Sequence, residues 1–465
     1  MSTTMTQIAP AQAIELVANP AQPDPKVPEQ PGSPPEPPSD AQELSGRLDK
    51  ATILKLSSAG FAFFVAGVND GSVGALIPYV IRQYDINTAI VSSIYGGNFF
   101  GWLFAAAFNT HLSQYLDLGA MLALGAIFQI IAHVLRSWSS PFALFVVTFW
   151  LVSMGQAFQD THANTYVAGV KGAHRWLAFI HAMYAAGTLV GPFVATPIAS
   201  AGEVSRWYLF YTFPLGLGIA NLAWCLVVFR DTVRLKTNTT ATVVVVVEEE
   251  AQHPDQEPDD SRNKGAIKLI KRTLQNRSVW FISIFFFFYL GAVLTASGWV
   301  TEFLVQVRNG NLSQMGYVPA GFNGGSLLGR ILLAEPTHRF GEKRMVFVYL
   351  VLAFTLQLVF WLVPNIIAAS IAISFIGFFT GPLFPTGISV ASKLFPQEIQ
   401  SPALAFVFVC AQMGGSAVPI VTGVIAANAG VAVLQPILVG ALVVTGISWF
   451  FVPNPKKTNP TLHQE

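Results

Sequence analysis

Twelve apolar windows, each long enough to cross a bilayer as one helix, occupy most of this chain. A transmembrane helix needs about 20 consecutive and mostly apolar residues. The sequence supplies such windows at approximately 53–81, 87–108, 118–135, 141–168, 176–200, 206–229, 278–304, 314–334, 344–363, 366–391, 402–427 and 430–452. Charged residues make up only 11% of the chain, too few to cover the surface of a soluble protein of this length. The sequence therefore predicts an all-α integral membrane protein with twelve transmembrane helices.

The windows fall into two halves of six, separated by the one long polar stretch of the chain. Residues 1–50 hold nine prolines between Pro20 and Pro38 and no apolar run. We expect a disordered tail there, because such a composition cannot bury enough surface to offset the cost of ordering. Residues 51–230 form the predicted N-terminal half, 231–276 a flexible linker, 277–453 the C-terminal half and 454–465 a C-terminal tail.

The Lys and Arg residues indicate how the helices are oriented. If both termini and the linker are cytoplasmic, most of the 26 basic residues lie in or beside cytoplasmic segments, as the positive-inside rule requires. The basic residues left on the opposite side are Arg82, Arg136, Arg206 and Arg308 in loops, with Arg330 at a helix end. The distribution therefore predicts cytoplasmic termini.

The same orientation predicts which sequon can be glycosylated, and further features of the sequence predict the membrane and the partners of the protein. Asn311 begins an Asn-Leu-Ser glycosylation sequon in a loop placed outside, whereas the sequon at Asn238 lies in the cytoplasmic linker. Only Asn311 should therefore accept a glycan. No retention signal is found, so the plasma membrane is the expected location. The net charge of +1 suggests no nucleic-acid partner.

Polar side chains inside the windows are the candidate functional residues, because each costs several kcal/mol in hydrocarbon unless it is solvated or paired. Ser153, Gln156, Asp160 and Asn164 recur every three or four residues along 141–168 and so lie on one helical face. The other polar candidates are Asp70, on a face with Gly67, Gly74 and Pro78, then Asn98, and then His181, Tyr184 and Thr188 on one face of 176–200.

A single buried polar residue has a simpler explanation than ligand binding. An Asn, Gln or His within a membrane more often makes one hydrogen bond to a neighbouring helix, and Asn98, His133 and His162 are open to that interpretation. Two aspartates at mid-membrane depth are harder to explain by packing, because Asn would serve the same purpose at lower cost. Asp70 and Asp160 are therefore predicted to be functional.

Motifs for other chemistry do not occur. The sequence has no phosphate-binding glycine loop with Lys and Ser/Thr, no Cys or His spacing for a metal, and no G-x-S-x-G nucleophile motif. Cys225 and Cys410 both lie in apolar windows and are expected to be buried thiols. We therefore expect neither an enzyme nor a cofactor or metal site.

Five motifs, in order along the chain, resemble the fucose permease-like branch of the major facilitator superfamily. NDGSVGALIPYV at 69–80 is similar to the first helix of that branch, and QDTHANTYV at 159–167 to its fourth. FYLGAVLTASGW at 288–299 resembles the seventh helix, GFFTGPLFPTGIS at 377–389 the tenth and GGSAVP at 414–419 the eleventh. The resemblance spans both halves and implies the major facilitator fold in a fungal-type member.

The resemblance also implies a function, that of a monomeric symporter that moves a monosaccharide with a proton by alternating access. Carried over residue by residue, Asp70 and Asp160 take up the proton, Asp70 also binds the sugar, and Asn69 and Asn164 support them. The candidate substrate-binding residues are Asp70, Asn69, Asn98, Gln156, Asn164, His181, Tyr184, Tyr289, Trp299 and Asn323. Lipid or core contact is the simpler role for any single aromatic among them.

The sequence departs from the branch at several points. Val293 stands where related sequences carry a polar or acidic residue, and His181 and Tyr184 stand where they carry Gln and Asn. The loop 109–119 lacks the superfamily's gating signature, whereas THRFGEKR at 337–344 keeps a better version, with the gating candidates Arg339, Gly341, Lys343 and Arg344. A carrier or exporter of another small metabolite and a non-transporting sensor are therefore the alternatives.

Overall fold

The structure is a computed structural model that describes residues 48–235 and 268–454, and every regular element in those ranges is a helix. The N-terminal half contains α2 (Lys50–Tyr84), α3 (Thr88–Val91), α4 (Ser93–Tyr115), α5 (Leu118–Arg136), α6 (Phe142–Ala168), α7 (Ala173–Ser200), η1 (Trp207–Tyr211) and α8 (Thr212–Val228). The C-terminal half contains α10 (Arg277–Gln306), α11 (Leu312–Met315), α12 (Val318–Leu332), α13 (Ala334–Phe340), α14 (Glu342–Leu362), α15 (Ile366–Thr380), α16 (Leu383–Leu394), η2 (Gln397–Ile399), α17 (Gln400–Ala429), η3 (Val431–Val433) and α18 (Leu434–Phe451). The all-α fold predicted from the sequence is confirmed.

Eleven helices within the described ranges are long and apolar enough to cross a membrane. The exception among the predicted windows is 314–334, where the chain breaks at Gly316 and Tyr317 and only the 15 residues of α12 continue. The predicted tails and most of the predicted linker lie outside the described residues. The end of that linker, residues 268–275, is helical, which its polar composition did not indicate.

The two halves pack by the same pattern of neighbours. In the first half α2 packs on α7, α5 on α6 and α4 on α6, and in the second α10 packs on α17, α14 on α15 and α12 on α15. The α2–α7 contact is close because both helices carry glycine where they meet. A Cβ added at Gly67 would lie 2.1 Å from the Tyr184 carbonyl oxygen, and one at Gly187 would lie 2.2 Å from that of Phe64.

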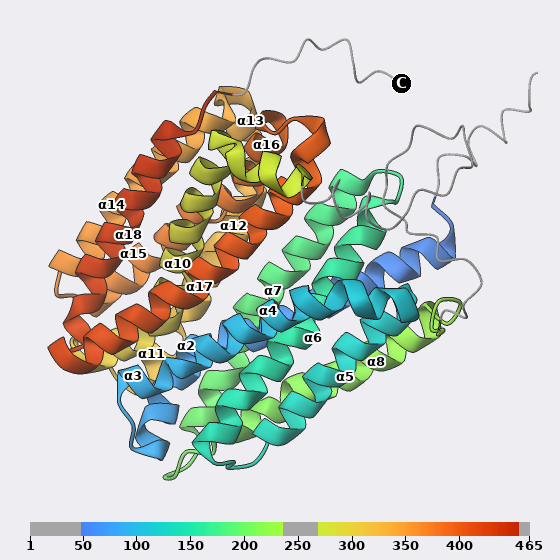
Figure 1. Ribbon diagram of the computed structural model, residues 1–465. Helices are drawn as coiled ribbons and strands as arrows, with labels where there is room; N and C mark the ends of the chain where they lie inside the picture. The colour runs from blue at the N-terminus through green and yellow to red at the C-terminus, as the bar shows by residue number, and fades with distance from the viewer. Residues whose placement is uncertain (1–47, 236–267, 455–465) are drawn as a thin grey trace, which may run out of the picture. The chain divides into compact units, whose positions relative to one another are not determined.

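The two ends of the bundle differ in how the halves meet. We call the end where α2 and α10 begin the proximal end, and the end where they finish the distal end. One apolar core joins both halves with residues from the distal parts of their helices, including Val80, Ile94, Trp299 and Phe303. The proximal parts form separate cores within each half. Figure 1 shows α3 of the first half beside α17 of the second, where Thr88 Oγ1 donates to the Gly423 carbonyl oxygen at 2.8 Å.

Candidate functional site

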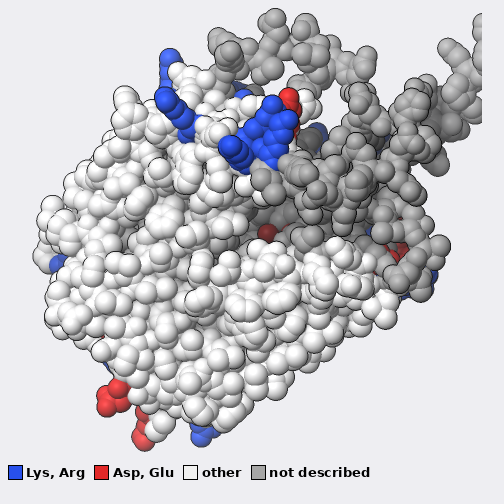
Figure 2. All heavy atoms as spheres, viewed as in Figure 1, with Lys and Arg blue, Asp and Glu red and all other residues white. Residues whose placement is uncertain are grey.

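A cavity of about 220 Å³ lies between the halves and is lined by α2, α4, α6 and α7 on one side and by α10, α12, α16 and α17 on the other. Its charged and titratable lining residues are Asp70, Tyr95, Asp160, His181, Tyr184 and Arg330. In Figure 2 the surface is hollowed between the halves, and an acidic atom is visible inside the hollow. Among the described residues the apolar core shared by the halves lies at the distal end, and the proximal parts of the halves have separate cores.

Asp70 receives hydrogen bonds from three helices. Its Oδ1 accepts from Asn69 Nδ2 at 2.9 Å and from Gln156 Nε2 at 3.0 Å, and its Oδ2 accepts from the Tyr184 hydroxyl at 2.8 Å. Four residues singled out from the sequence on α2, α6 and α7 are therefore brought together. Three donors hold the carboxylate in one orientation and satisfy its charged form.

Asn69 links this carboxylate to a cation that the sequence placed elsewhere. Arg136 Nη1 donates to Asn69 Oδ1 at 2.8 Å and its Nε donates to Thr148 Oγ1. The guanidinium lies over the Phe149 ring, 3.9 Å from its centroid, and Arg136 has no exposed surface. The prediction that Arg136 lies in a loop is wrong, because its side chain turns inward from the last residue of α5.

Asp160 also lines the cavity but has fewer partners than Asp70. Asn164, one turn along the same helix, interacts with its carboxylate, although Asn164 does not itself line the cavity. Ser153, from the same predicted stripe, donates to Asn98 Oδ1 at 2.6 Å, and both residues line the cavity. His181 lines it from α7 with its ring packed edge-on against Phe63. The predicted polar face of α6 thus faces the cavity as far as Asp160.

The C-terminal candidates lie outside the cavity lining, each with its polar group engaged. The Tyr289 hydroxyl donates to the Thr380 carbonyl oxygen at 3.0 Å, and Trp299 Nε1 donates to that of Pro419 at 3.3 Å. Asn323 Nδ2 donates across the halves to the Thr188 carbonyl oxygen at 2.9 Å. Their part in substrate binding stays a prediction.

Arg330 is a cavity residue that the sequence did not single out. It lies near the proximal end of α12 and its Nε donates to the Gly381 carbonyl oxygen at 3.2 Å. The sequence showed it only as a positive charge at the end of an apolar window. A signal was nevertheless present, because an arginine preceded by Gly-Ser-Leu-Leu-Gly continues the small-residue face of its helix.

The predicted gating residues lie between α13 and α14 at the proximal end. Arg339 pairs with Glu335 at 2.6 Å on the surface. Gly341 has a φ of 96°, a conformation that a residue with a side chain rarely adopts. The Lys343 carbonyl oxygen accepts from Trp449 Nε1 at 3.0 Å, which ties this turn to α18. None of the four candidates, Arg344 included, is among the lining residues of the cavity.

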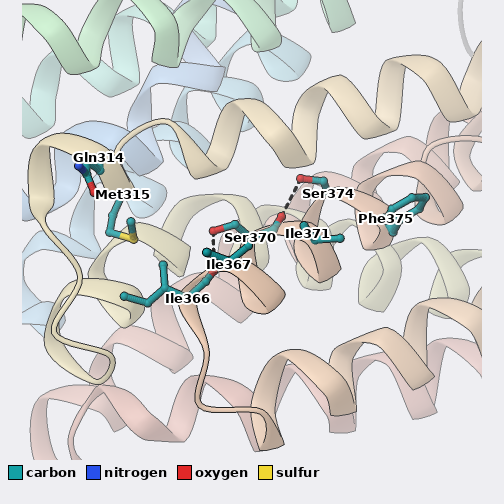
Figure 3. A pocket seen from close by; sticks show the side chains of 8 residues that line it. All are labelled: Gln314, Met315, Ile366, Ile367, Ser370, Ile371, Ser374 and Phe375. Carbon is teal, nitrogen blue, oxygen red and sulfur yellow. Dashed lines mark hydrogen bonds between the residues drawn. The ribbon is translucent and has the colours of Figure 1, made fainter.

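Two further features bear on the predictions. A larger space of about 530 Å³ lies beside α11 and α15 (Figure 3), lined by Gln314, Met315, Ile366, Ile367, Ser370, Ile371, Ser374 and Phe375. The Ser370 and Ser374 hydroxyls there donate to carbonyl oxygens of their own helix, and none of the lining residues is charged.

The predicted glycosylation residue, Asn311, is exposed as the N-cap of α11, and its Oδ1 accepts hydrogen bonds from the Ser313 amide and hydroxyl.

Comparison with known proteins identifies the family. The family model for the Major Facilitator Superfamily matches residues 59–376 and 302–465. The chain therefore belongs to the Major Facilitator Superfamily, an integral membrane family with the fold of secondary transporters. It is 26% identical over 388 residues to Bypass of stop codon protein 6 of Saccharomyces cerevisiae, covering 79% of this chain and 76% of that protein.

Solved structures share the fold at low sequence identity. A bacterial homolog of the human lysosomal transporter Spinster, inward-facing and unoccupied, matches with a TM-score of 0.66 and 12% identity over 87% of this chain and 98% of that one. The transporter FucP in its outward conformation matches with a TM-score of 0.59 and 16% identity over 87% of this chain and 100% of that one. The major facilitator fold predicted from the sequence is confirmed, whereas its fucose permease-like branch stays a prediction.

Proposed function

We propose that this chain is a proton-coupled secondary transporter of a small polyhydroxylated solute of the monosaccharide class. The observation that carries the proposal is the pair of aspartates, Asp70 and Asp160, that line one cavity between two halves whose described residues share an apolar core at the distal end. Acids at membrane depth are energetically costly, so their presence there indicates a function. Rocking of the halves around such a midplane site is the movement by which this fold exposes a solute to each side in turn.

The two aspartates have different roles in the proposal. Asp160, with its one carboxamide neighbour, carries the proton. Asp70, whose carboxylate is oriented by three hydrogen-bond donors, accepts a further hydrogen bond from a hydroxyl group of the solute. Coupling requires that the empty and the fully loaded carriers rock readily. A carrier that holds only one of the two ligands takes an uncompensated charge through the occluded state and stalls.

Asp160→Asn tests this division. The substitution is nearly isosteric and permanently neutral, so we expect solute exchange across proteoliposome membranes to continue and accumulation driven by a pH gradient to be abolished. Asp70→Asn should weaken solute binding as well. Asp85→Asn, at the exposed C-cap of α2, is the matched control and should behave as wild type. Proton-driven accumulation by Asp160→Asn would move the proton site elsewhere, with His181 next to be tested.

The proposal places the distal end outside the cell, in the plasma membrane, with both termini in the cytoplasm. The basic residues support this orientation, and Asn311 provides the test because it is exposed at the distal end. Expression in a eukaryotic host should give a glycosidase-sensitive form that Asn311→Gln removes. A glycan at Asn238 would reverse the orientation.

A further inference from the structure

Arg330 places a guanidinium in the cavity wall of the C-terminal half, while both lining carboxylates come from the N-terminal half. It lies within an apolar helix, and an arginine at membrane depth costs several kcal/mol unless something compensates it. Among the described residues Arg330 forms no ion pair, since the pairs found there involve Lys55, Arg272, Arg339 and Lys393. Its charge therefore has no counterion among the residues that the structure describes.

The fold fixes Arg330 through the break between α15 and α16. In a continuous helix the Gly381 carbonyl oxygen would accept from the amide of residue 385, but that residue is Pro385 and has no N–H. The free carbonyl instead accepts from Arg330 Nε at 3.2 Å. The helices meet closely enough because a Cβ at Gly381 would lie 2.3 Å from the Ser326 carbonyl oxygen. Nε is engaged by the Gly381 carbonyl oxygen, and the Tyr289 hydroxyl also interacts with the guanidinium. The guanidinium still has terminal N–H groups that can donate to a carboxylate in the cavity.

The charges of the site can be counted in each state of the carrier. Arg136 compensates the charge of Asp70 through Asn69. The charges whose compensation differs between the empty and the loaded carrier are therefore those of Asp160 and Arg330. We take Tyr95, His181 and Tyr184, the other titratable groups of the lining, as neutral. The empty carrier then holds one negative and one positive charge. After a proton neutralises Asp160, a neutral sugar leaves Arg330 uncompensated, whereas a monoanion restores neutrality.

We infer that Arg330 binds a carboxylate of the solute, so the substrate is a hydroxylated monocarboxylate of sugar size, a sugar acid, carried with one proton. The inference rests on the proposed proton-coupled function. An uncompensated charge in a site closed to water costs several kcal/mol, enough to prevent the loaded carrier from rocking. The cycle with a monoanion avoids that cost and moves no net charge across the membrane.

Binding to the purified full-length protein at fixed pH tests Arg330 alone. The probes are D-galacturonate and D-galactose, which differ by a carboxylate in place of a hydroxymethyl group. We expect galacturonate to bind roughly tenfold more tightly or better, the effect of one charged hydrogen-bonded contact. Arg330→Gln should abolish that preference and Arg330→Lys should keep part of it. Arg272→Gln, which removes an exposed arginine, should leave the preference unchanged.

Equal binding of the two probes, or no binding of galacturonate, would overturn the inference. If Arg330→Gln does not fold, the preference for galacturonate over galactose is compared between the wild type and Arg330→Lys, and a reduced preference in Arg330→Lys supports the inference. In proteoliposomes, a pH gradient should drive galacturonate accumulation, and an imposed potassium diffusion potential should not change it. Accumulation of galactose that follows the membrane potential refutes the monoanion and leaves proton coupling standing. Arg330-dependent binding of galacturonate without proton-driven accumulation supports the monoanion and refutes proton coupling.

Discussion

Each half directs one arginine side chain inward, but the surroundings of the two arginines differ: Arg136 is fully buried, whereas Arg330 is partly exposed in the cavity wall. In the N-terminal half Arg136 is closed in, with Asn69 and Thr148 accepting its hydrogen bonds and the Phe149 ring covering one face of the guanidinium. In the C-terminal half Arg330 donates to the Gly381 main-chain carbonyl oxygen, interacts with the Tyr289 hydroxyl and lines the cavity. The two arginines lie on non-equivalent helices of the repeated pattern, because α5 corresponds to α14 and α12 corresponds to α4.

The contrast separates a structural charge from a binding charge. A buried ion with satisfied donors contributes to stability only as part of its network, and removing it leaves its partners unpaired. An ion that lines a cavity and can still donate hydrogen bonds there is available to a ligand. Arg136 has no exposed surface and does not line the cavity, although its Nη2 has no hydrogen-bond partner among the described residues. We therefore expect Arg136 to stabilise and orient the Asp70 site, and Arg330, which lines the cavity, to take part in recognition.

Removing Arg136 should therefore have the largest effect. Arg136→Gln leaves Asn69, Thr148 and Asp70 without their buried cation, and breaking such a network costs about 3–5 kcal/mol. We expect little folded protein after size-exclusion chromatography and a large fall in the melting temperature followed by tryptophan fluorescence. Arg308→Gln, which removes an arginine bonded only to the Phe360 and Trp361 carbonyl oxygens, is the control. Wild-type stability of Arg136→Gln would remove the distinction between the two arginines.

The second prediction concerns the halves as moving bodies. A Cβ at Gly74 of α2 would lie 2.1 Å from the Ser297 carbonyl oxygen of α10, so any larger residue pushes the halves apart at the distal end. Gly74→Ala should destabilise the distally closed state by about 1–3 kcal/mol, which shifts its population roughly 5- to 150-fold. Spin labels at Glu203 and Leu362, exposed at the distal end of each half, should show a longer distance.

Gly446→Ala is the matched control for that experiment, because a Cβ at Gly446 meets nothing within 4 Å. It should leave the distance distribution unchanged. An unchanged distribution in Gly74→Ala would mean that the two halves do not separate at this contact. Arg330 and Asp160 would then belong to a static cavity.

The sequence predicts the parts of this molecule that depend on periodicity. Apolar windows located the helices, and a spacing of three or four residues placed Gln156 and Asp160 on the face that meets Asp70. Periodicity gives the face of a helix but not the reach of a long side chain. Arg330 lies in the last turn of α12, as predicted, and Arg136 is the last residue of α5 and not part of a loop. The periodicity of the sequence does not show that both side chains turn inward.

Breaks within helices are a second limit of the sequence. The interruption at Gly316 and Tyr317 shortens α12, and the one at Gly381 provides the carbonyl oxygen that holds Arg330. Pro385 signals the second break, but the partner of the freed carbonyl is distant in sequence and is known only from the packing of α12 on α15. Tertiary contacts of this kind decide which polar residues form the site.

A third cation, at the water-exposed proximal end, completes the comparison and should have the smallest effect. Lys55 Nζ lies 2.7 Å from Asp231 Oδ2, and the Asp231 side chain is 56% exposed. The hydrogen bond from Lys55 lowers the pKa of Asp231 below its usual value. The stability that the pair contributes is therefore complete above the unfolded-state pKa, about 4 for Asp, and is lost as the pH falls through the lowered folded-state value.

Lys55→Gln should accordingly reduce stability at neutral pH by no more than about 1 kcal/mol, because solvent screens an exposed pair. The difference from wild type should disappear in acid, where Asp231 is protonated in both proteins. Thermal unfolding of the two proteins across a pH series measures this, with Lys50→Gln, an exposed lysine at the start of α2, as the control. A loss as large as that of Arg136→Gln, or one that persists in acid, would show that burial is not what separates these cations.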